Sequence, residues 1–484
     1  MFEELCRNGV YRNLLEGRWV ETSGAPIPIT APADGRLLGR VQAYGKADVD
    51  RAMESARNAQ RAWAAFPVSR RAEILHRAAD LLEENTEELA GILSDEIAKD
   101  IASARSEVTR TAEFIRFTAD EGRHLEGETI GAESFPGFKK DRFSLVTRVP
   151  LGVVLAISPF NYPINLSASK LAPALIAGNS VVLKPPTAGA VSALHLAEVF
   201  RAAGLPDGVL NTVTGKGGEI GDYLVTHPLV NFINFTGSTA VGQHIAKIAG
   251  MVPMLMELGG KDAAVVLADA DLDEAARDII SGAYSYSGQR CTAVKRVLVV
   301  EEAADALVAR LKERVERLKA GNPRQEGVQI TPLINAHAAD YVQELIDDAL
   351  EKGAELVAGN RREGNLLYPT LFDRVTEKMR LAWEEPFGPV LPVLRVQNAD
   401  EAVRIANKSE YGLQASVFTK NIDAAFSIAA RLEVGTVHIN NKTERGPDHF
   451  PFLGVKSSGM GTQGIRYSIE AMSRHKVVVL NLGA

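Results

Sequence analysis

The sequence predicts an α/β protein that folds into more than one domain. Its 484 residues exceed what a single compact core usually holds. Apolar, strand-like runs alternate with helical stretches from about residue 150 onward. This alternation is typical of a parallel sheet with helices on its faces, the kind of sheet that binds nucleotides. With 46% hydrophobic and 24% charged residues, the composition is that of an ordinary globular protein.

The first 130 residues are expected to contain short strands followed by long helices. Residues 11–45 carry strand patterns that are broken by glycines, by prolines and by the Asp34-Gly35 turn. Residues 47–129 are rich in Ala, Glu and Arg and have the apolar periodicity of amphipathic helices.

The middle of the chain predicts the parallel sheet. Residues 153–157 (Val-Val-Leu-Ala-Ile) form a continuous apolar run, which favours a strand that is buried on both faces. Similar strands are expected at 181–183, 209–213 and 230–235, with helices between them at 165–177, 189–203 and 217–226. A second α/β series runs from about 262 to 440, and a last strand at 477–480 could pair outside its own domain.

Charge and residue usage argue against several classes of protein. The net charge of −7 argues against a general binder of nucleic acid or of anionic membranes. We find no secretion-signal pattern and no apolar run near 20 residues in the sequence. Two cysteines in the whole chain fit a reducing compartment, so we expect the cytoplasm. The nine histidines form no i, i+4 pair and no cluster with cysteine, so we expect no metal site.

Cys291 is the strongest candidate for a reactive group. It follows a helical pattern and a glycine turn, and Arg290 precedes it directly. A cation beside a thiol favours the thiolate, which is the nucleophilic form. The alternative is a buried cysteine that serves only as a small apolar residue.

Residues 235–242 (Phe-Thr-Gly-Ser-Thr-Ala-Val-Gly) are a candidate phosphate-binding loop. They follow a strand and open a helix, and a helix N-terminus favours an anion. The loop lacks the middle glycine of the G-x-G-x-x-G fingerprint, so an ordinary strand–helix turn is the alternative.

Glu257 is a candidate general base at the end of the next strand. Its carboxylate lies between apolar Met256 and Leu258, so it should leave the strand on the side opposite to them. Partial desolvation there would raise its pKa. The alternative is a structural carboxylate that caps the turn at Gly259-Gly260.

These segments resemble the aldehyde dehydrogenase superfamily over almost the whole chain. The matching segments, in order, are 158–163 (Ser-Pro-Phe-Asn-Tyr-Pro), 184–187 (Lys-Pro-Pro-Thr), 235–238 (Phe-Thr-Gly-Ser), 257–261 (Glu-Leu-Gly-Gly-Lys), 288–291 (Gly-Gln-Arg-Cys) and 384–389 (Glu-Glu-Pro-Phe-Gly-Pro). The resemblance implies a three-part fold and a homodimer or homotetramer. The parts are a Rossmann-like cofactor-binding domain (1–130 and 151–257), an α/β catalytic domain (258–456) and a small β oligomerisation arm (131–150 and 468–484).

The resemblance also implies catalytic roles. Cys291 matches the nucleophile that attacks an aldehyde carbon, and Asn161 matches a side-chain donor to the resulting oxyanion. Glu257 matches the base that activates water to hydrolyse the thioester. For Asn161, a simple turn residue before Tyr162-Pro163 is the alternative.

The implied cofactor is NADP, with NAD as a weaker second cofactor. The pattern of Lys184 with Thr187 resembles that of NADP-preferring members, because an acid at Thr187 would repel a 2′-phosphate. The alternatives are that Thr187 is the N-cap of the next helix and that Glu385 and Phe387 belong to a strand-end turn. The matched cofactor positions are Ser158, Phe160, Lys184, Thr187, Gly237, Ser238, Glu385 and Phe387.

Within the superfamily, segments 157–163, 231–238, 287–298, 380–389 and 443–448 resemble the non-phosphorylating glyceraldehyde-3-phosphate dehydrogenases. This branch oxidises an aldehyde that carries a phosphate, without using inorganic phosphate. Its phosphate-binding residues match Arg110, Tyr162, Arg290 and Arg445, and guanidinium groups suit phosphate because they bind it bidentately. A surface ion pair is the alternative for each arginine, above all for Arg110, whose own helix offers Glu107 and Glu113.

Two rival functions stay open from the sequence. The first is the same chemistry on another aldehyde, which could be neutral, sulfonated or differently phosphorylated. A neutral substrate, however, would leave the arginines unpaired. An inactive relative that only binds a nucleotide or serves as a structural protein is the other, although Cys291 and Glu257 are both retained.

Overall fold

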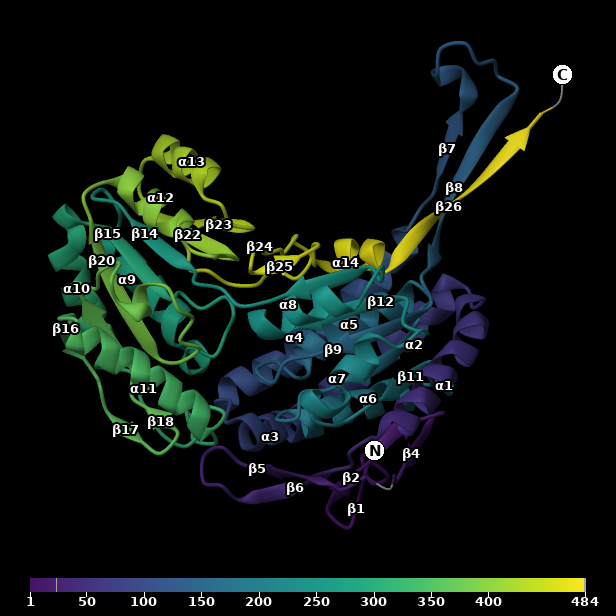
Figure 1. Ribbon diagram of the computed structural model, residues 1–484, viewed down its shortest axis with the longest axis horizontal. Helices are drawn as coiled ribbons and strands as arrows, with labels where there is room; N and C mark the ends of the chain where they lie inside the picture. The colour runs from purple at the N-terminus through teal and green to yellow at the C-terminus, as the bar shows by residue number, and fades with distance from the viewer. Residues whose placement is uncertain (23, 483–484) are drawn as a thin grey trace.

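The computed structural model describes residues 1–22 and 24–482 and shows a mixed α/β protein (Figure 1). Two large sheets, one of six strands and one of seven, lie in separate lobes, and a three-stranded arm projects away from both (Figure 1). In this part of the chain, no helix combines the length and the apolar character that a membrane span requires.

The N-terminal segment builds a small sheet and then four helices, as the sequence predicts. The sheet has the order β1-β2-β6-β5, and β3 pairs separately with β4. The strands are β1 (Cys6–Arg7), β2 (Val10–Tyr11), β3 (Asn13–Leu15), β4 (Arg18–Val20), β5 (Ile27–Thr30) and β6 (Leu37–Val41). The helices are α1 (Lys46–Ala64), α2 (Val68–Glu84), α3 (Thr86–Ile97) and α4 (Ile101–Glu121), followed by the 3-10 turn η1 (Gly122–His124).

The six-stranded sheet confirms the predicted strand–helix series to within three residues at each boundary. Its strands are β9 (Val153–Ile157), β10 (Ser180–Lys184), β11 (Leu210–Thr212), β12 (Phe232–Thr236), β13 (Met254–Glu257) and the short edge strand β25 (Gly459–Met460). The connecting helices are α5 (Asn165–Ile176), α6 (Ala190–Ala202), α7 (Gly217–Val225) and α8 (Thr239–Ile248).

Helices cover both faces of this sheet. Along β9, Val154 and Ala156 pack in the cluster that contains α2 to α6, whereas Val153 and Leu155 pack against α1, α7 and α8. Successive side chains of a strand point to opposite faces, so a strand between two helical layers must be apolar throughout. This explains the continuous apolar run at 153–157.

The strand order places a crevice at one edge of the sheet. The order is β11-β10-β9-β12-β13, all parallel, with β25 antiparallel on the outer side of β13. The chain therefore moves outward in opposite directions from β9 and from β12. In such sheets, ligands bind beyond the carboxyl ends of the strands where the direction reverses.

The seven-stranded sheet forms the second lobe. Its order is β16-β19-β20-β15-β14-β22-β23, parallel except for the β16–β19 pair. The strands are β14 (Ala263–Val266), β15 (Arg296–Val300), β16 (Glu355–Ala358), β19 (Thr370–Asp373), β20 (Val390–Val396), β22 (Gln414–Phe418) and β23 (Thr436–Ile439). The helices are α9 (Leu272–Tyr284), α10 (Glu301–Val315), α11 (Ala336–Glu351), α12 (Ala399–Asn407) and α13 (Ile422–Arg431).

Short elements complete this lobe. They are the turns η3 (Ser285–Gly288) and η4 (Arg380–Ala382), the pair β17 (Arg362–Glu363) with β18 (Leu366–Leu367), and the pair β21 (Tyr411–Gly412) with β24 (Val455–Lys456).

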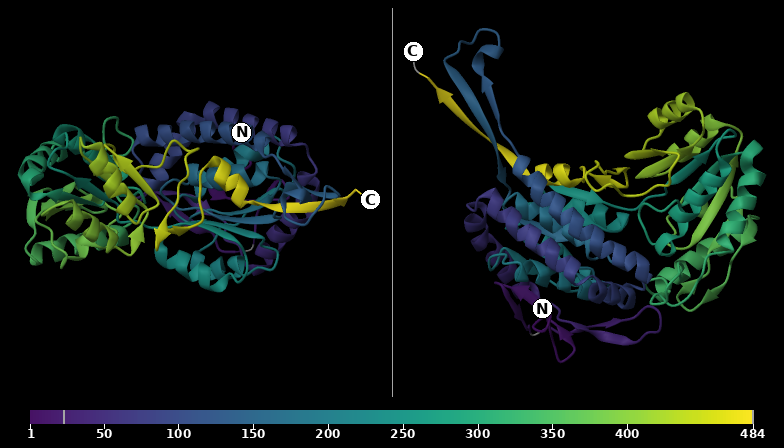
Figure 2. Two further views of the ribbon diagram at one scale, coloured as in Figure 1. Left: turned by 90° about the horizontal axis from the view of Figure 1, so that it is seen from above. Right: turned by 180° about the vertical axis from the view of Figure 1, so that it is seen from behind.

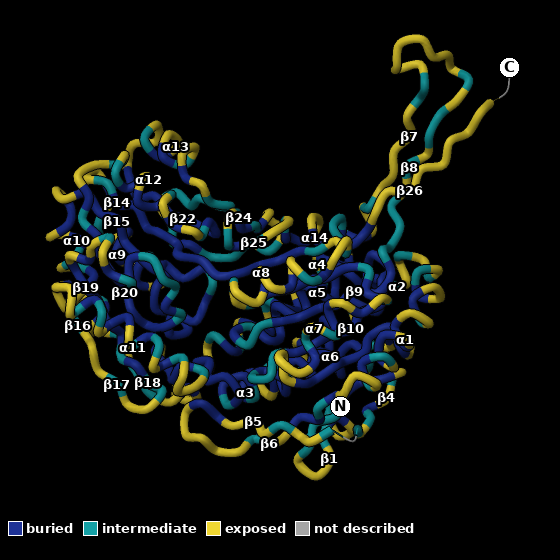
Figure 3. The backbone as a smooth tube through the Cα atoms, in the orientation of Figure 1, coloured by how far each residue is buried: buried dark blue, intermediate teal, exposed yellow. Residues whose placement is uncertain are grey.

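The arm joins distant parts of the chain. Strands β7 (Glu128–Gly131) and β8 (Arg142–Pro150), with η2 (Ala132–Ser134) between them, pair with β26 (Ser473–Asn481), which follows α14 (Ile465–Ala471). Figure 2 shows the arm standing clear of both lobes from two further directions, and Figure 3 shows that it is mostly exposed. The strand predicted at 477–480 is thus confirmed as part of β26. The domain boundaries stay a prediction, and residues 483 and 484 of the predicted arm lie outside the described residues.

Candidate active site

A cavity of about 850 Å³ opens at the crevice of the six-stranded sheet and reaches across to the second lobe. It begins at the ends of β9 and β12, where the strand order reverses, as expected for a ligand site. Its size lies within the range of small-molecule and cofactor sites, about 300–1,000 Å³. The predicted site residues that line it are Ser158, Phe160, Asn161, Lys184, Gly237, Ser238, Cys291, Glu385 and Phe387.

A strained turn carries Cys291 into this cavity. After α9 ends, Tyr286 and Ser287 both have left-handed backbone conformations, with φ of 50° and 53°. Such conformations cost free energy in residues other than glycine and persist where the surroundings impose them. Gly288 follows with φ of 72°, and any side chain there would overlap the carbonyl of Gly388. The glycine of the predicted turn is therefore required by its conformation and by its close neighbour.

Burial disfavours the thiolate of Cys291. The side chain is only partly exposed, and desolvation raises the pKa of its thiol to about 11. The expected stabilisation of the thiolate by Arg290 is not found, because the Arg290 guanidinium donates a hydrogen bond to the Gly282 carbonyl. The cation that does lower the pKa is that of Lys295, four residues after the cysteine. The sequence expectation of a thiolate favoured by Arg290 is therefore wrong for this arrangement.

Lys295 connects the Cys291 loop to the carboxylate of Glu385. Its ammonium group donates to the Cys291 carbonyl and lies 2.9 Å from Oε1 of Glu385. The same Glu385 oxygen accepts a hydrogen bond of 3.1 Å from the backbone N–H of Gly260. Glu385 is thus more than a residue of a strand-end turn, since it bonds to two other walls of the cavity. The sequence analysis missed Lys295, although its position four residues from Cys291 was a usable signal.

Asn161 is held beside the nucleophile loop. Its side chain is 3% exposed, and Nδ2 donates a hydrogen bond of 2.9 Å to the Gln289 carbonyl. The loop is also tied to the body of the lobe, because Oγ of Ser287 donates to the Thr331 carbonyl at 2.8 Å. An amide nitrogen has two donors, so one hydrogen of Asn161 remains for a group near Cys291.

Glu257 is a buried carboxylate without a hydrogen-bond partner. It ends β13 and is 2% exposed, and neither of its oxygens has a partner among the described residues. Burial raises its pKa to about 8, against the opposing effects of Arg445 and Lys170. The alternative that Glu257 caps the following turn is wrong, because the N–H groups of Gly259 and Gly260 bond to Thr239 and Glu385 instead.

Lys170 is a second buried titratable group at this centre. It lies on α5, every residue of which is buried, and Nζ donates a hydrogen bond of 2.7 Å to Oγ1 of Thr236. Burial, followed by the charge of Arg445, lowers its pKa to about 7, while Glu257 and Cys291 act in the opposite direction. The sequence analysis missed Lys170, although a lysine inside the apolar run 164–176 is a visible anomaly.

The predicted phosphate-binding loop has the conformation that its sequence suggests. Ser238 is the N-cap of α8, with extended backbone, and its side chain is exposed toward the cavity side of the helix start. A Cβ on Gly237 would lie 2.5 Å from the Phe235 ring, so only glycine fits there. The start of α7 adds glycines at 217, 218 and 221, where added side chains would meet nothing within 4 Å. Backbone is therefore open to a large ligand on this side.

Lys184 and Thr187 differ in their relation to the cavity. Lys184 is buried and lines the cavity, burial lowers its pKa to about 8, and Nζ donates to the Pro185 carbonyl at 3.1 Å. Thr187 is half-buried in the loop after β10 and is not among the lining residues. The alternative that Thr187 caps α6 is wrong, because the N-cap of that helix is Gly189, with φ of 96°.

Two of the predicted arginines converge on one carboxylate. Nε and Nη2 of Arg110 donate to Asp448 at 2.7 and 2.9 Å, and Nε of Arg445 lies 3.6 Å from the same side chain. The local partners suggested for Arg110 are taken by other residues: Glu107 pairs with Lys99, and Glu113 pairs with Arg116. The sequence analysis missed Asp448 as a partner, since it is distant in sequence from Arg110.

The surroundings of these arginines relate them to the catalytic groups. The charge of Arg445 acts on both Glu257 and Lys170, and the centroid of the Tyr162 ring lies 3.5 Å from Nζ of Lys99. Arg290 is 9% exposed, and its Nε has no hydrogen-bond partner among the described residues.

The chain is similar to known proteins over nearly its whole length. The sequence model of the aldehyde dehydrogenase family matches residues 19–478. The chain belongs to the aldehyde dehydrogenase family. An NADP-dependent glyceraldehyde-3-phosphate dehydrogenase from Streptococcus equinus is 58% identical over 98% of this chain and 99% of its own. The solved structure of such an enzyme from Bacillus halodurans C-125 in complex with NADP has a TM-score of 0.97, with 54% identity over 98% of this chain and 99% of that one. A 3-sulfolactaldehyde dehydrogenase from Priestia aryabhattai is 40% identical over 98% of both chains.

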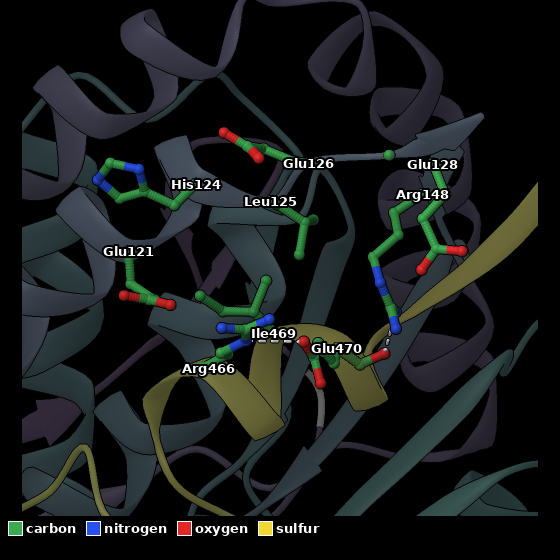
Figure 4. Close-up of a pocket in the computed structure, with 10 residues that line it drawn as sticks. Glu121, His124, Leu125, Glu126, Glu128, Arg148, Arg466, Ile469 and Glu470 are labelled. Atoms are coloured by element: carbon green, nitrogen blue, oxygen red, sulfur yellow. Dashed lines mark hydrogen bonds and ion pairs between the residues drawn. The ribbon is translucent and has the colours of Figure 1, made fainter. Parts of the chain in front are cut away.

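A second cavity of this aldehyde dehydrogenase lies at the base of the arm, and Figure 4 shows its lining. It has a volume of about 420 Å³ and is lined by Glu121, His124, Leu125, Glu126, Gly127, Glu128, Arg148, Arg466, Ile469 and Glu470. In this cavity Arg466 pairs with Glu470 at 3.0 Å, and Arg148 donates to the Glu470 carbonyl (Figure 4). No cysteine is among its lining residues, whereas Cys291 lines the first cavity, which is therefore the candidate active site.

Among residues 1–22 and 24–482, no group of three or more His, Cys, Asp or Glu side chains is arranged to hold a metal ion.

Proposed function

We propose that this chain oxidises D-glyceraldehyde 3-phosphate to 3-phosphoglycerate with NADP and without inorganic phosphate. The observation that carries the proposal is the desolvated Glu257, which offers a base for water near the only cysteine of the cavity. Water that is activated by this base can hydrolyse a thioester on Cys291 and so release the carboxylic acid product. The names of the Streptococcus equinus and Bacillus halodurans relatives support the choice of substrate and cofactor.

The reaction begins with attack by Cys291. Its Sγ bonds to the aldehyde carbon while the thiol proton passes to a nearby base, so a thiohemiacetal forms. Because burial raises the pKa of the free thiol to about 11, this proton transfer needs assistance, and the cation of Lys295 is the nearby charge that lowers this pKa. The free amide hydrogen of Asn161 and the backbone N–H of Cys291 stabilise the oxyanion, and each such donor contributes about 3 kcal/mol to the transition state.

When bound, NADP supplies the oxidant that accepts a hydride from the substrate carbon. Cys291 then holds the substrate as a thioester. Glu257 takes a proton from water, which attacks the thioester carbon and releases the acid and the thiol. A base whose pKa lies near the working pH is efficient in such a transfer, and that of Glu257 is about 8.

The chain's own residues fit the cofactor along the cavity. The helix start at Ser238 and the glycines of α7 suit the phosphates, and Lys184 suits the 2′-phosphate of NADP. Ser158 and Gly237 line the same cavity, and Thr187 lies in the loop that follows Lys184, outside the lining residues. Glu385 and Phe387 suit the nicotinamide riboside at the other end, where the Phe160 and Phe387 rings lie 5.9 Å apart. NAD is expected to be a weaker cofactor.

Substrate recognition is assigned to Arg110, Tyr162, Arg290 and Arg445. A phosphate monoester carries nearly two negative charges at neutral pH, and arginine is the side chain that matches it best. A sulfonated aldehyde is the second candidate, because the 40% identical relative is named as a 3-sulfolactaldehyde dehydrogenase.

The assembly is proposed to be a homodimer or homotetramer in the cytoplasm. The arm exposes an apolar strand that a second copy can cover, and both cysteines are free, as is usual in a reducing compartment.

The test is to measure kcat/KM with NADP for three aldehydes in buffer free of inorganic phosphate: D-glyceraldehyde 3-phosphate, D-glyceraldehyde and 3-sulfolactaldehyde. We expect the phosphorylated aldehyde to exceed the unphosphorylated one by roughly a hundredfold or more, as expected for several charge-assisted bonds. A higher value for the sulfonated aldehyde would transfer the proposal to that substrate, and equal values for all three would contradict it.

A further inference from the structure

Asp448 lies between two cations of the substrate site. Its side chain is 11% exposed, and it accepts the paired N–H groups of Arg110 in a two-pronged contact. Nε of Arg445 lies 3.6 Å from the same carboxylate, and Nη2 of Arg110 also donates to the Arg445 carbonyl. One carboxylate therefore fixes one guanidinium on α4 and another in the loop that follows β23.

Without this carboxylate the arrangement would be unfavourable. Two guanidinium groups that converge repel each other, and the repulsion is strong where water is scarce. Arg445 is 14% exposed on its side chain and its charge already reaches Glu257 and Lys170.

Asp448 also lowers the positive charge of the arginine pair. Arg110 and Arg445 bring two positive charges, and Asp448 brings one negative charge. A phosphate monoester, which carries nearly two negative charges, suits a pair of guanidinium groups held in place. The contact to Asp448 uses the Nε and Nη2 edge of Arg110, and Nη1 has no partner among the described residues.

We propose that Asp448 is a positioning residue that holds Arg110 and Arg445 as a preformed pair for the phosphate of the substrate. The proposal rests on the proposed function, because it deepens the recognition of the substrate phosphate. Asp448 does not touch the reacting atoms. Its effect is expected on the binding of anions and not on the chemical step.

The test compares Asp448→Asn with wild type on D-glyceraldehyde 3-phosphate and on D-glyceraldehyde. We expect KM for the phosphorylated aldehyde to rise by roughly tenfold to a hundredfold, because the arginine pair loses its charged partner. We expect kcat to stay within about threefold and the constants for D-glyceraldehyde to stay nearly unchanged. Asp448→Glu should restore part of the lost affinity, since it restores the charge.

A matched control is Asp305→Asn, which removes an exposed partner of Arg395 outside the cavity. This control should leave kcat and KM unchanged for both aldehydes. An unchanged or lower KM of Asp448→Asn for the phosphorylated aldehyde would overturn the proposal, because Asp448 would then merely compete with the substrate. An equal loss with both aldehydes would overturn it too, since that pattern indicates general damage to the loop.

A third arm separates this proposal from the proposed function. Inorganic phosphate should inhibit D-glyceraldehyde oxidation competitively, and Asp448→Asn should weaken that inhibition by a factor similar to its change in KM. If wild type does not favour the phosphorylated aldehyde, the proposed function fails, yet weaker phosphate inhibition in the variant still supports the role of Asp448. If phosphate inhibits both proteins equally, the role of Asp448 is contradicted whichever aldehyde is favoured.

Discussion

At the scale of single residues, the site depends on ionisable groups that the fold removes from water. Glu257 is almost fully buried and has no hydrogen-bond partner among the described residues, while Arg445 and Lys170 act on it through their charges. Carboxylates in such surroundings hold a proton near neutral pH, which suits repeated proton transfer. Cys291 has the opposite need, because burial keeps it protonated until a base assists it.

Replacing the two reacting side chains separates the two halves of the reaction. Cys291→Ser should abolish turnover, because a hydroxyl at neutral pH is a much poorer nucleophile than a thiolate.

Glu257→Gln should give a burst of NADPH of about one equivalent per site and then stall. Mass spectrometry of the stalled protein should show the acyl group on Cys291. Absence of both burst and adduct would show that Glu257 already acts before the oxidation.

The raised pKa of Glu257 predicts a pH-dependent stability. Its folded pKa of about 8 exceeds the ordinary value of 4.5, so the folded state binds this proton more tightly. The corresponding stabilisation is complete below about pH 4 and is lost as the pH rises through 8, at roughly 1.4 kcal/mol per pH unit within this window. The glutamine in Glu257→Gln does not titrate. The melting temperature of the variant minus that of wild type should therefore increase as the pH rises from about 5 to 9. A constant difference across this range would contradict the buried, protonated state.

The sequence could predict the identity of the reacting residues but not the surroundings that tune them. Cys291, Glu257 and Asn161 stand in motifs, so a resemblance locates them. Lys295 and Asp448 gain their roles only from folding, because their partners Glu385 and Arg110 are distant in sequence. The pKa of Cys291 likewise depends on burial, which no local pattern specifies.

At the scale of elements, the apolar runs were enough to place the strands. Each strand of the six-stranded sheet from β9 to β12 was expected, because a strand covered on both faces has few alternatives. The turn η3 could not be expected, since two non-glycine residues there adopt left-handed backbone imposed by their surroundings. The start of α6 was predicted to within one residue, but its N-cap is Gly189 and not Thr187, which was the alternative.

The loop between β10 and α6 allows a test of cofactor choice. Thr187→Glu should lower kcat/KM for NADP by about tenfold to a thousandfold, because a carboxylate there would repel the 2′-phosphate and compete for Lys184. The value for NAD should rise only slightly, since one new hydrogen bond adds about 1 kcal/mol. Both cofactors are to be measured at saturating aldehyde, with Thr187→Ser as the control. Equal losses for both cofactors would show that position 187 matters only for the loop.

The arm offers a second test at this scale. Val478 and Leu480 lie two residues apart on β26, are 47% and 41% exposed, and so share one face of the strand. The double variant Val478→Asp and Leu480→Asp should dissociate the proposed oligomer, because charges would replace the apolar surface that a second copy covers. Sedimentation velocity should show a smaller species than wild type, and the paired Thr variant should remain assembled. An unchanged sedimentation coefficient would contradict a role of this face in assembly.

At the scale of the whole molecule, the site exists only where the two lobes meet. The six-stranded sheet and its loops supply Asn161, Lys184 and Glu257, whereas the second lobe supplies Cys291 and Glu385. All of these except Glu257 line the cavity. The order of strands explains why the crevice opens at β9 and β12. The sequence indicated both α/β series, but the side-by-side placement of their loops follows from tertiary packing.

The central claim is that water, activated by Glu257, resolves the thioester on Cys291. The most direct measurement is the oxidation of D-glyceraldehyde 3-phosphate with NADP at increasing concentrations of inorganic phosphate, starting from none, with identification of the product. The account predicts full turnover without inorganic phosphate and 3-phosphoglycerate as the product. A strict requirement for inorganic phosphate, with an acyl phosphate as the product, would contradict it.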